Sequence, residues 1–471
     1  MIDANQLKMS QQNRRKFLKK ASLGGLLLFG ASTSKAEEQL LQTPVDEDFN
    51  KKYGPNDTVR LGFIGCGIQG FANARSAIKN PGVEVAAACD LYTGRLDRMK
   101  EVFGAGIFTT RDFREILNRK DIDAVCISTS DHWHDHQLKA ALAAGKPVYC
   151  EKPMMHHIDE GLSMVEAERK SGLPVQIGSQ RASGLETLKA KELLESGAIG
   201  DLILADIRSD RNSSNGAWQY SIPTDAGPET VDWDAFLGDA PKRPFDKTRF
   251  FRWRNYDDYG TGVAGDLFVH LFTALHIITS SKGPSKIYGT GGLRFWKDGR
   301  DAPDVTLGLL DYEKCAAHPA FNVQMRVNFV DGSGGGSHVN LIGTEGMMTI
   351  GYDGITVKSN PVQTQPSFGG WDSYDTFSEK QQAEFKKWFE SEYADKNYQM
   401  KSPAEIKYTI PQGFDTHKTH WKVFTDAVRG KNKIVEDTAF GLRAAAPSLA
   451  TNVSMKMGKP ILWDGEGMKL V

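Results

Sequence analysis

A glycine-rich turn directly after a short apolar stretch constrains the fold of this chain more than any other sequence feature. Residues 60–64 lead into the turn Gly65–Gly70 (Gly-Cys-Gly-Ile-Gln-Gly), and a helical pattern follows over residues 71–79. Strand, glycine turn and helix in this order start a βαβ unit. Further apolar stretches alternate with helical patterns and occupy residues 83–89, 124–128, 148–150 and 175–177. Strands that alternate with helices predict a parallel sheet covered by helices.

The pattern changes after residue 180. Beyond a helical stretch near residues 186–195, longer strand-like segments occupy residues 202–210, 286–295, 321–330, 337–341 and 347–350. Turn signals such as Asp331-Gly332 and Asp353-Gly354 separate several of them, which is typical of an antiparallel sheet. Helical patterns return over residues 378–393, 421–428 and 438–457. The predicted fold class is α/β, with an N-terminal Rossmann-type doubly wound parallel sheet and a C-terminal α/β domain that has a large, mainly antiparallel sheet.

The 471 residues are enough for two or three domains at roughly 150 residues each. We predict a nucleotide-binding domain over residues 58–180 and a substrate and oligomerisation domain over residues 181–463. A polar loop and a charged helix suggest an insertion or arm at about 360–415 within the second domain. The predicted flanking segments are a signal peptide at 1–36, a linker at 37–57 and a C-terminal tail at 464–471.

The first 36 residues have the order of an export signal. Arg14-Arg15 and neighbouring basic residues precede an apolar stretch at 21–31, and small residues follow at 34–36, as in a secretory signal peptide. The paired arginines, followed by Phe-Leu-Lys, resemble a twin-arginine signal, which exports proteins already folded. This pattern predicts a periplasmic protein that uses the twin-arginine machinery. The alternative is a basic N-terminus on a cytoplasmic protein.

Composition excludes several classes of protein. The formal net charge of the whole chain is −1. Without the basic first 36 residues, the chain has 51 basic and 58 acidic residues and is acidic. An acidic body lacks the electrostatic footprint of a nucleic-acid binder. No apolar run reaches the ~18–20 residues of a membrane span, and no cysteine follows the apolar stretch to carry a lipid anchor. The five cysteines form no Cys-x-x-Cys pair, and four lie in or beside predicted buried strands, which suits folding in a reducing compartment.

The glycine turn predicts a dinucleotide site. Gly65 and Gly67 let a pyrophosphate approach the backbone, and the helix that starts beside Ile68 and Gln69 offers free N–H groups. Asp90 ends the next strand, 20 residues after Gly70, where a carboxylate binds both ribose hydroxyls and repels a 2′-phosphate. NAD is therefore favoured over NADP. Arg95 is close enough in sequence to weaken that preference.

Three further motifs follow in order. Ser128–His134 (Ser-Thr-Ser-Asp-His-Trp-His) and Glu151-Lys152-Pro153 come at the ends of the predicted strands at 124–128 and 148–150, at the sheet edge where ligands bind. A third segment, 260–270, ends in Asp266-x-x-x-His270. With these motifs the chain resembles the Gfo/Idh/MocA oxidoreductases, the glucose–fructose oxidoreductase and inositol dehydrogenase family, from about residue 59 to residue 463. The family usually has proline where this chain has Ser130.

The resemblance implies a role for each motif. In the family, residues matching Thr129, Trp133, His134 and Glu151 lie against the cofactor, and those matching Lys152, Asp266 and His270 carry catalysis. The chemistry agrees, because oxidising a secondary alcohol removes a hydroxyl proton while hydride leaves the same carbon. Asp266 and His270 are four apart and would share one helix face. His270 would take the proton, Asp266 would orient it or bind substrate, and Lys152 would stabilise the reacting oxygen and lie near the nicotinamide.

Other side chains admit more than one interpretation. His132, His134 and His136 alternate as zinc ligands can, but they coincide with the family's cofactor segment, so we predict no metal. Arg181 and Tyr259 are predicted substrate contacts. His156 and His157, just after Glu-Lys-Pro, are either substrate contacts or surface residues.

The motifs are compatible with three functions. The first is an exported NAD-dependent oxidoreductase that oxidises or reduces a secondary hydroxyl of a sugar, glycoside or polyol, with the cofactor held tightly. The second is an NAD-dependent glycosidase or lyase that oxidises a sugar hydroxyl transiently; related glycosidases do not keep the lysine matching Lys152, which favours the first. The third is a sugar-binding protein without activity. The family resemblance also implies a dimer or tetramer formed through the antiparallel sheet.

Overall fold

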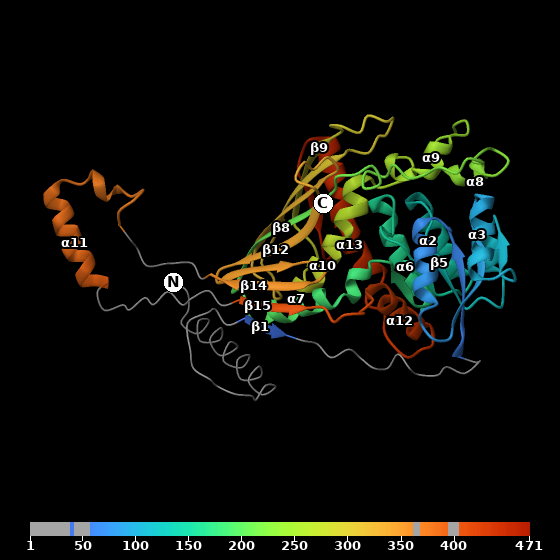
Figure 1. Cartoon of the computed structure of the whole chain (residues 1–471), viewed down its shortest axis with the longest axis horizontal. Helices are drawn as coiled ribbons and strands as arrows, with labels where there is room; N and C mark the ends of the chain where they lie inside the picture. Colours follow the sequence, from blue (N-terminus) through green and yellow to red (C-terminus); the bar gives the residue numbers. More distant parts are fainter. Residues whose placement is uncertain (1–37, 42–56, 361–367, 394–404) are drawn as a thin grey trace.

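The computed structural model describes residues 38–41, 57–360, 368–393 and 405–471. The predicted signal peptide at 1–36 lies outside the described residues, as does most of the linker predicted at 37–57. Two sheets dominate the described structure, one of six strands and one of eleven. Figure 1 shows the two sheets at opposite ends of the body, with helices packed between them.

The N-terminal sheet is parallel, as predicted, and has the strand order β4-β3-β2-β5-β6-β7. Its strands are β2 (Val59–Ile64), β3 (Val83–Cys89), β4 (Phe108–Thr110), β5 (Ala124–Ile127), β6 (Val148–Cys150) and β7 (Val175–Ile177). The connecting helices are α2 (Ile68–Ala77), α3 (Thr93–Phe103), α4 (Phe113–Leu117), α5 (His134–Ala143) and α6 (Gly161–Ser171). The strand order reverses between β2 and β5, and ligands bind in the crevice at such a switch point. The sequence did not predict β4 or α3.

The second sheet is mixed and mostly antiparallel, in the order β1-β15-β14-β13-β12-β8-β11-β10-β9-β16-β17. Its strands are β1 (Glu38–Leu41), β8 (Leu202–Asp210), β9 (Lys286–Gly292), β10 (Val305–Tyr312), β11 (Phe321–Asn328), β12 (Gly336–Gly343), β13 (Gly346–Ile350), β14 (Gly354–Ser359), β15 (Glu405–Thr409), β16 (Ile461–Asp464) and β17 (Lys469–Leu470). Two pairs, β8 with β11 and β1 with β15, are parallel. The large, mainly antiparallel sheet predicted from the turn signals is confirmed.

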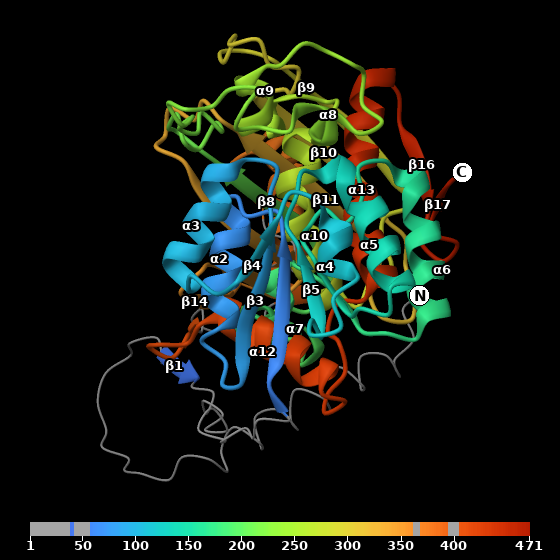
Figure 2. The same cartoon turned by 90° about the vertical axis from the view of Figure 1, so that its right-hand side faces the viewer.

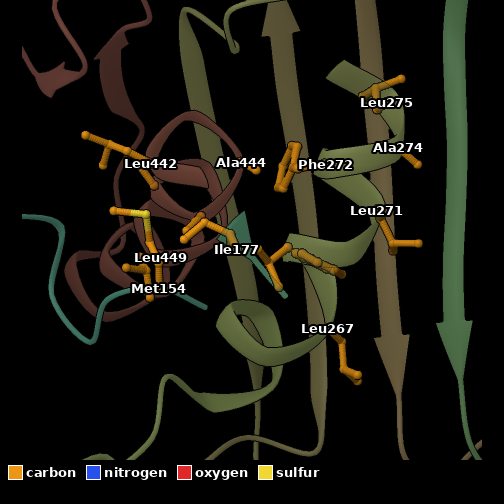
Figure 3. Close-up of a cluster of buried hydrophobic side chains, with 14 of the residues drawn as sticks. Met154, Ile177, Leu267, Leu271, Phe272, Ala274, Leu275, Leu442, Ala444 and Leu449 are labelled. Carbon is orange, nitrogen blue, oxygen red and sulfur yellow. The ribbon is translucent and has the colours of Figure 1, made fainter. Parts of the chain in front are cut away.

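A shared apolar core joins the two sheets. Helices α7 (Leu185–Glu195), α10 (Val269–Thr279) and α13 (Thr438–Met457) pack on the second sheet. Figure 3 shows Phe272 of α10 on the side toward Ala444 of α13, with Ile177 at the end of β7 beside them. The end of the parallel sheet is therefore held in the core of the second domain.

Helix α12 (Thr416–Val428) completes the nucleotide domain from a distant part of the chain. Trp421 stacks on Tyr149 of β6 with ring centroids 4.1 Å apart, and it also contacts Phe63 of β2. Both Trp421 and Phe424 are fully buried in the same cluster as the strands β2 and β5. Figure 2 shows α12 beneath the parallel sheet.

Three further helices lie outside the core shared by the two sheets. Helices α8 (Trp233–Leu237) and α9 (Lys247–Phe251) cross above the carboxyl end of the parallel sheet, and α11 (Glu379–Tyr393) projects away from both sheets in Figure 1. None of the helices in the described part of the chain combines the length and the apolar character that a membrane crossing needs.

Candidate active site

Of the three glycines in the turn, only the middle one, Gly67, has room for a side chain. A Cβ atom on Gly65, whose φ is +88°, would lie 2.6 Å from the backbone of Ser128, and a Cβ on Gly70 would lie 2.0 Å from the carbonyl oxygen of Gly65. At Gly67 the nearest atoms to such a Cβ belong to the Arg95 guanidinium, 3.7 Å away. Gly65 and Gly70 therefore allow the strand and the helix to pack closely. Gly67 leaves the backbone accessible to a ligand.

A cavity of about 560 Å³ opens above this turn. Its walls include Gly65, Gly67, Ile68, Gln69, Asp90, Arg95, Thr129 and Trp133 from the predicted cofactor set. Helix α2 starts here without a side-chain cap or an acidic residue in its first turn, so its first N–H groups are available to an anion. The size, the open glycine and the helix N-terminus fit a dinucleotide.

The Asp90 carboxylate is fixed at the end of β3. Its Oδ2 accepts the N–H of Cys66 at 2.7 Å, and its Oδ1 accepts the N–H of Tyr92 at 2.9 Å. Arg95 Nη1 lies 3.4 Å from Oδ1, and its guanidinium packs over the ring of Phe251. The acid predicted to bind ribose therefore also joins the glycine turn to β3, and Arg95 offsets part of its charge.

Glu151 is a buried carboxylate with several amide partners. Its Oε1 accepts hydrogen bonds from Gln69 at 3.1 Å, Asn73 at 2.9 Å and Gln180 at 3.2 Å. These partners come from α2 and from the loop after β7, so Glu151 holds the start of the cofactor helix against the neighbouring strand ends. This network fixes the backbone immediately before Lys152.

The segment 128–134 connects the two domains. Buried Asp131 accepts both the N–H and the hydroxyl of Thr261, at 2.9 and 2.8 Å. The Trp133 indole donates to the carbonyl of Phe236 at 2.9 Å, and His134 Nδ1 lies 2.7 Å from the carbonyl of Pro153. The cofactor segment is thereby tied to the loop that leads to Asp266.

The three alternating histidines have different partners. His132 Nε2 lies 2.9 Å from the carbonyl oxygen of Phe236, and burial lowers the pKa of His132 to about 4. His134 faces Pro153 as described above, whereas His136 lies 3.3 Å from Asp239. The structure does not bring these rings around a common point.

Lys152, Asp266 and His270 meet at a second, smaller cavity of about 180 Å³. Lys152 Nζ lies 3.0 Å from Asp266 Oδ1 and donates to the Asp266 carbonyl at 2.9 Å. Arg254 Nε lies 3.2 Å from the same Oδ1. Burial acts to raise the pKa of Asp266, but Lys152 and Arg254 outweigh it and hold that pKa far below its usual value.

Asp266 lies in a π-helical turn, Ala264–Phe268, that runs directly into α10. The sequence predicted one regular helix for Asp266 and His270, and the wider turn changes their angular offset. Single π-turns inside helices are frequent at functional sites. Burial, followed by the charges of Lys152 and Arg181, lowers the pKa of His270 well below its ordinary value. His270 is therefore a neutral imidazole at neutral pH.

The two cavities adjoin. Ile68, Gln69 and Thr129 line both of them, as do Tyr220 and Arg254. Of the predicted site residues, those on the smaller cavity are Ile68, Gln69, Thr129, His134, Glu151, Lys152, Asp266 and His270. A ligand in the larger cavity thus has its inner end beside Lys152.

The two predicted substrate contacts lie elsewhere. Tyr259 is fully buried in an aromatic cluster with Phe236 and His132, and it lines neither cavity. The Arg181 guanidinium stacks over the ring of Tyr352 at 4.8 Å, outside both cavity walls. The sequence analysis missed Gln180, Arg211, Trp218, Tyr220 and Arg254, all of which line the smaller cavity. No motif surrounds these five residues, so only the fold identifies them.

The nucleotide domain is similar to known oxidoreductase domains. Residues 59–179 match the model of the Gfo/Idh/MocA family, described as an oxidoreductase family with an NAD-binding Rossmann fold. The match covers the nucleotide domain and ends before the second domain. The chain is 32% identical over 149 residues to inositol 2-dehydrogenase of Salmonella typhimurium (31% of this chain, 44% of the relative). It is 30% identical over 155 residues to glycosyl hydrolase family 109 protein 1 of Shewanella sp. strain ANA-3 (31% and 34%). The matches thus span less than half of these curated relatives.

Solved structures extend the likeness to the fold of both domains. The scyllo-inositol dehydrogenase of Lactobacillus casei, solved with NAD(H) and scyllo-inositol, has a TM-score of 0.57 at 19% identity, covering 86% of this chain and 99% of that one. The WlbA dehydrogenase of Bordetella pertussis, solved with NADH and UDP-GlcNAcA, has a TM-score of 0.60 at 15% identity, with the same coverage. At these identities the likeness concerns the fold alone.

Proposed function

We propose that the protein is an exported NAD-dependent oxidoreductase that acts on a secondary hydroxyl of a sugar, glycoside or polyol. The observation that carries the proposal is the Lys152–Asp266 ion pair, which shares the smaller cavity with His270 and adjoins the dinucleotide cavity. Inositol dehydrogenases among the relatives support a polyol or sugar as substrate.

Each of the three residues has a distinct task. Bound NAD would supply the acceptor for hydride. Lys152 donates a hydrogen bond to the reacting oxygen and stabilises negative charge on it. Asp266 holds Lys152 in place through their ion pair. His270 accepts the hydroxyl proton, and its lowered pKa leaves it unprotonated and ready to do so.

The cofactor proposed is NAD, held tightly. Asp90 at the end of β3 disfavours a 2′-phosphate, although Arg95 beside it reduces that effect. Because a periplasm does not recycle free NAD, we propose that the cofactor is exported inside the folded protein and cycles between two half-reactions on different substrates.

A transient-redox glycosidase is the second candidate, and the similarity to a family 109 glycosyl hydrolase favours it. One experiment separates the two. The purified protein is mixed with a library of glycosides and polyols while absorbance near ~340 nm is recorded, since reduced nicotinamide absorbs there. A lasting signal supports net oxidation. Product release without a steady signal supports the glycosidase, and absence of both contradicts any nicotinamide chemistry on these substrates.

Export is tested separately. The cysteines support folding in a reducing compartment before export, because all five thiols are free and four are buried. Replacing Arg14 and Arg15 together by Lys should leave folded, uncleaved protein in the cytoplasm. Normal appearance of that double variant in the periplasm would remove the twin-arginine proposal.

We propose a homo-oligomer formed through the outer face of the large sheet. Leu309 of β10 and Leu462 of β16 are half exposed although both lie in strands, and Tyr288 of β9 is paired with Leu309 in register. Exposed apolar side chains on one sheet face favour association. The molecular mass in solution tests this, and a monomer at micromolar concentration contradicts it.

A further inference from the structure

Every carboxylate on the smaller cavity already has its partners. Asp266 is paired with Lys152 and Arg254, and Asp131 accepts two hydrogen bonds from Thr261. The remaining carboxylate is Glu151, whose oxygens accept the amides of Gln69, Asn73 and Gln180 and the N–H of Lys152. A cationic group on a substrate would therefore find no free acceptor among these acids.

One cation on the same cavity has no acidic partner. Arg211 follows β8 directly and lines the cavity. Its Nη1 donates to the carbonyl of Gly216 at 2.9 Å, and its guanidinium lies 5.4 Å from the centre of the Phe329 ring. Among the described residues no carboxylate lies within 4.0 Å of this guanidinium. Since a guanidinium has five N–H donors, most of them remain available.

The backbone holds Arg211 in place as well. Its N–H donates to the carbonyl of Asn328 at 2.8 Å, and its carbonyl accepts the N–H of Asp331. Nearby arginines of the same sheet differ, because Arg208 pairs with Asp206 and Arg326 pairs with Asp210. A fixed, unpaired guanidinium facing a cavity is preorganised for an anion.

The charge around His270 agrees with this arrangement. After burial, the groups that lower the pKa of His270 are Lys152, Arg181 and Arg211, while Asp266 opposes them. Arg211 is therefore one of three cations whose charge acts on His270, where the substrate hydroxyl would lie.

We propose that Arg211 binds an anionic group, a carboxylate or a phosphate, on the carbohydrate substrate. The proposal rests on the proposed function for the substrate's identity as a carbohydrate, and it narrows that class from neutral polyols to sugar acids or sugar phosphates. The planar guanidinium fork matches both anions with two parallel hydrogen bonds, so the experiment has to separate them.

The first test is independent of turnover. The full-length purified protein with NAD is titrated with sodium acetate or inorganic phosphate at constant ionic strength, and its thermal unfolding midpoint is followed, because a ligand that binds the native state raises it. We expect a saturable rise with one of the two anions, and at least a tenfold weaker response in Arg211→Met. Arg211→Lys should keep part of the response, and the matched control Arg208→Met should keep all of it. No saturable rise with either anion, or an unchanged response in Arg211→Met, would overturn the proposal.

The second test uses substrates with one skeleton. Glucose, glucuronate and glucose 6-phosphate are compared as reductants of bound NAD in the wild type and in Arg211→Met. A wild-type preference for either anionic sugar that Arg211→Met loses supports the proposal, and which sugar is preferred identifies the anion. Equal rates with glucose and both anionic sugars overturn it. Anion binding without turnover of any sugar supports the Arg211 site and contradicts the proposed oxidoreductase instead.

Discussion

The two cavities are built in opposite ways. The dinucleotide cavity has its main recognition residues in one continuous part of the chain, namely the glycine turn, Asp90 and Arg95, and residues 232–254 of the second domain also line it. The smaller cavity takes Lys152, Arg211, Arg254 and Asp266 from separate segments of both domains. The first can therefore be recognised from a motif and is shared with many relatives, whereas the second depends on how this chain packs its two domains. Substitutions in the two cavities should therefore have different effects on turnover, NAD binding and stability.

The largest effect is expected at the smaller cavity. Lys152→Met should lower turnover about 10²–10³-fold, since loss of one preorganised donor costs about 3–4 kcal/mol in the transition state. NAD retention should not change, because the glycine turn and Asp90 hold the dinucleotide. Turnover and bound NAD are measured on the same preparation, with Lys139→Met as a surface control. Near-normal turnover would move the assignment to the glycosidase, in which this lysine is dispensable.

His270→Ala should also lower turnover, by less than the Lys152 change, because hydroxide can replace a missing base. Part of the loss should return at high pH. The double variant with Lys152→Met should be little worse than Lys152→Met alone, since groups that act on one proton transfer are not additive. Strict additivity of the two losses would show that the residues act in separate steps.

The glycine turn offers a sharper comparison inside the first cavity. Gly70→Ala should destabilise the fold by about 1–3 kcal/mol, as overpacking does, because its Cβ would lie 2.0 Å from the carbonyl oxygen of Gly65. Gly67→Ala should leave the unfolding midpoint of the cofactor-free protein unchanged and weaken NAD binding, since its Cβ meets only open space and Arg95. Thermal unfolding and NAD titration of the two variants test the pair. Equal NAD affinity in Gly67→Ala and wild type would contradict the cofactor position.

Asp90→Ala should reduce NAD retention by about tenfold or more, because each lost hydrogen bond to a charged acceptor is worth roughly 1.5–3 kcal/mol. The same change should lower stability, since the buried N–H of Cys66 loses its acceptor. Asp90→Asn keeps one of the two oxygen acceptors and should recover part of the stability. Full NAD occupancy in purified Asp90→Ala would show that this carboxylate does not bind the cofactor.

The smallest effect concerns pH. Because the pKa of His270 is lowered, activity should be retained as pH falls through the ordinary histidine range and be lost only below it, where the imidazole is protonated. Removing a nearby positive charge in Arg211→Met should raise that pKa and move the acidic limb of the profile to higher pH. The profile of kcat/KM against pH measures both. A limb that stays in place in Arg211→Met would show that the two side chains do not interact.

The sequence predicted the parts of the fold in which local pattern and burial agree. Residues 83–89 and 202–210 form the predicted strands, and apolar residues occupy most of their buried positions, such as Val83 and Ala87 in the first and Leu202 and Ile207 in the second. The strand Phe108–Thr110 was missed because three residues carry no periodic signal. The strand Val305–Tyr312 was missed because its pattern does not alternate clearly: the buried positions include Thr306 and Gly308, and the outward Leu309 is apolar and half exposed.

In the candidate site too, motifs predict some of the residues and only the structure shows the others. The positions of Lys152, Asp266 and His270 around one cavity follow from the Glu-Lys-Pro and Asp-x-x-x-His motifs, but their partner Arg254 comes from a short 3₁₀ turn that belongs to no motif. Tyr259 was predicted to contact substrate because it adjoins a glycine turn, yet the side chain packs inward against Phe236. Sequence neighbours can therefore be inferred from a motif, whereas side-chain direction in a loop depends on tertiary packing.

The position of α12 has a consequence for how the molecule is made. Trp421 fills the core between β2 and β6, yet it is synthesised long after both strands have left the ribosome. The nucleotide domain therefore cannot complete its core until most of the chain exists. Residues 58–180 expressed alone would expose the surface that Trp421 and Phe424 cover. Recombination could therefore transfer this domain to another protein only together with the distant segment that contains α12.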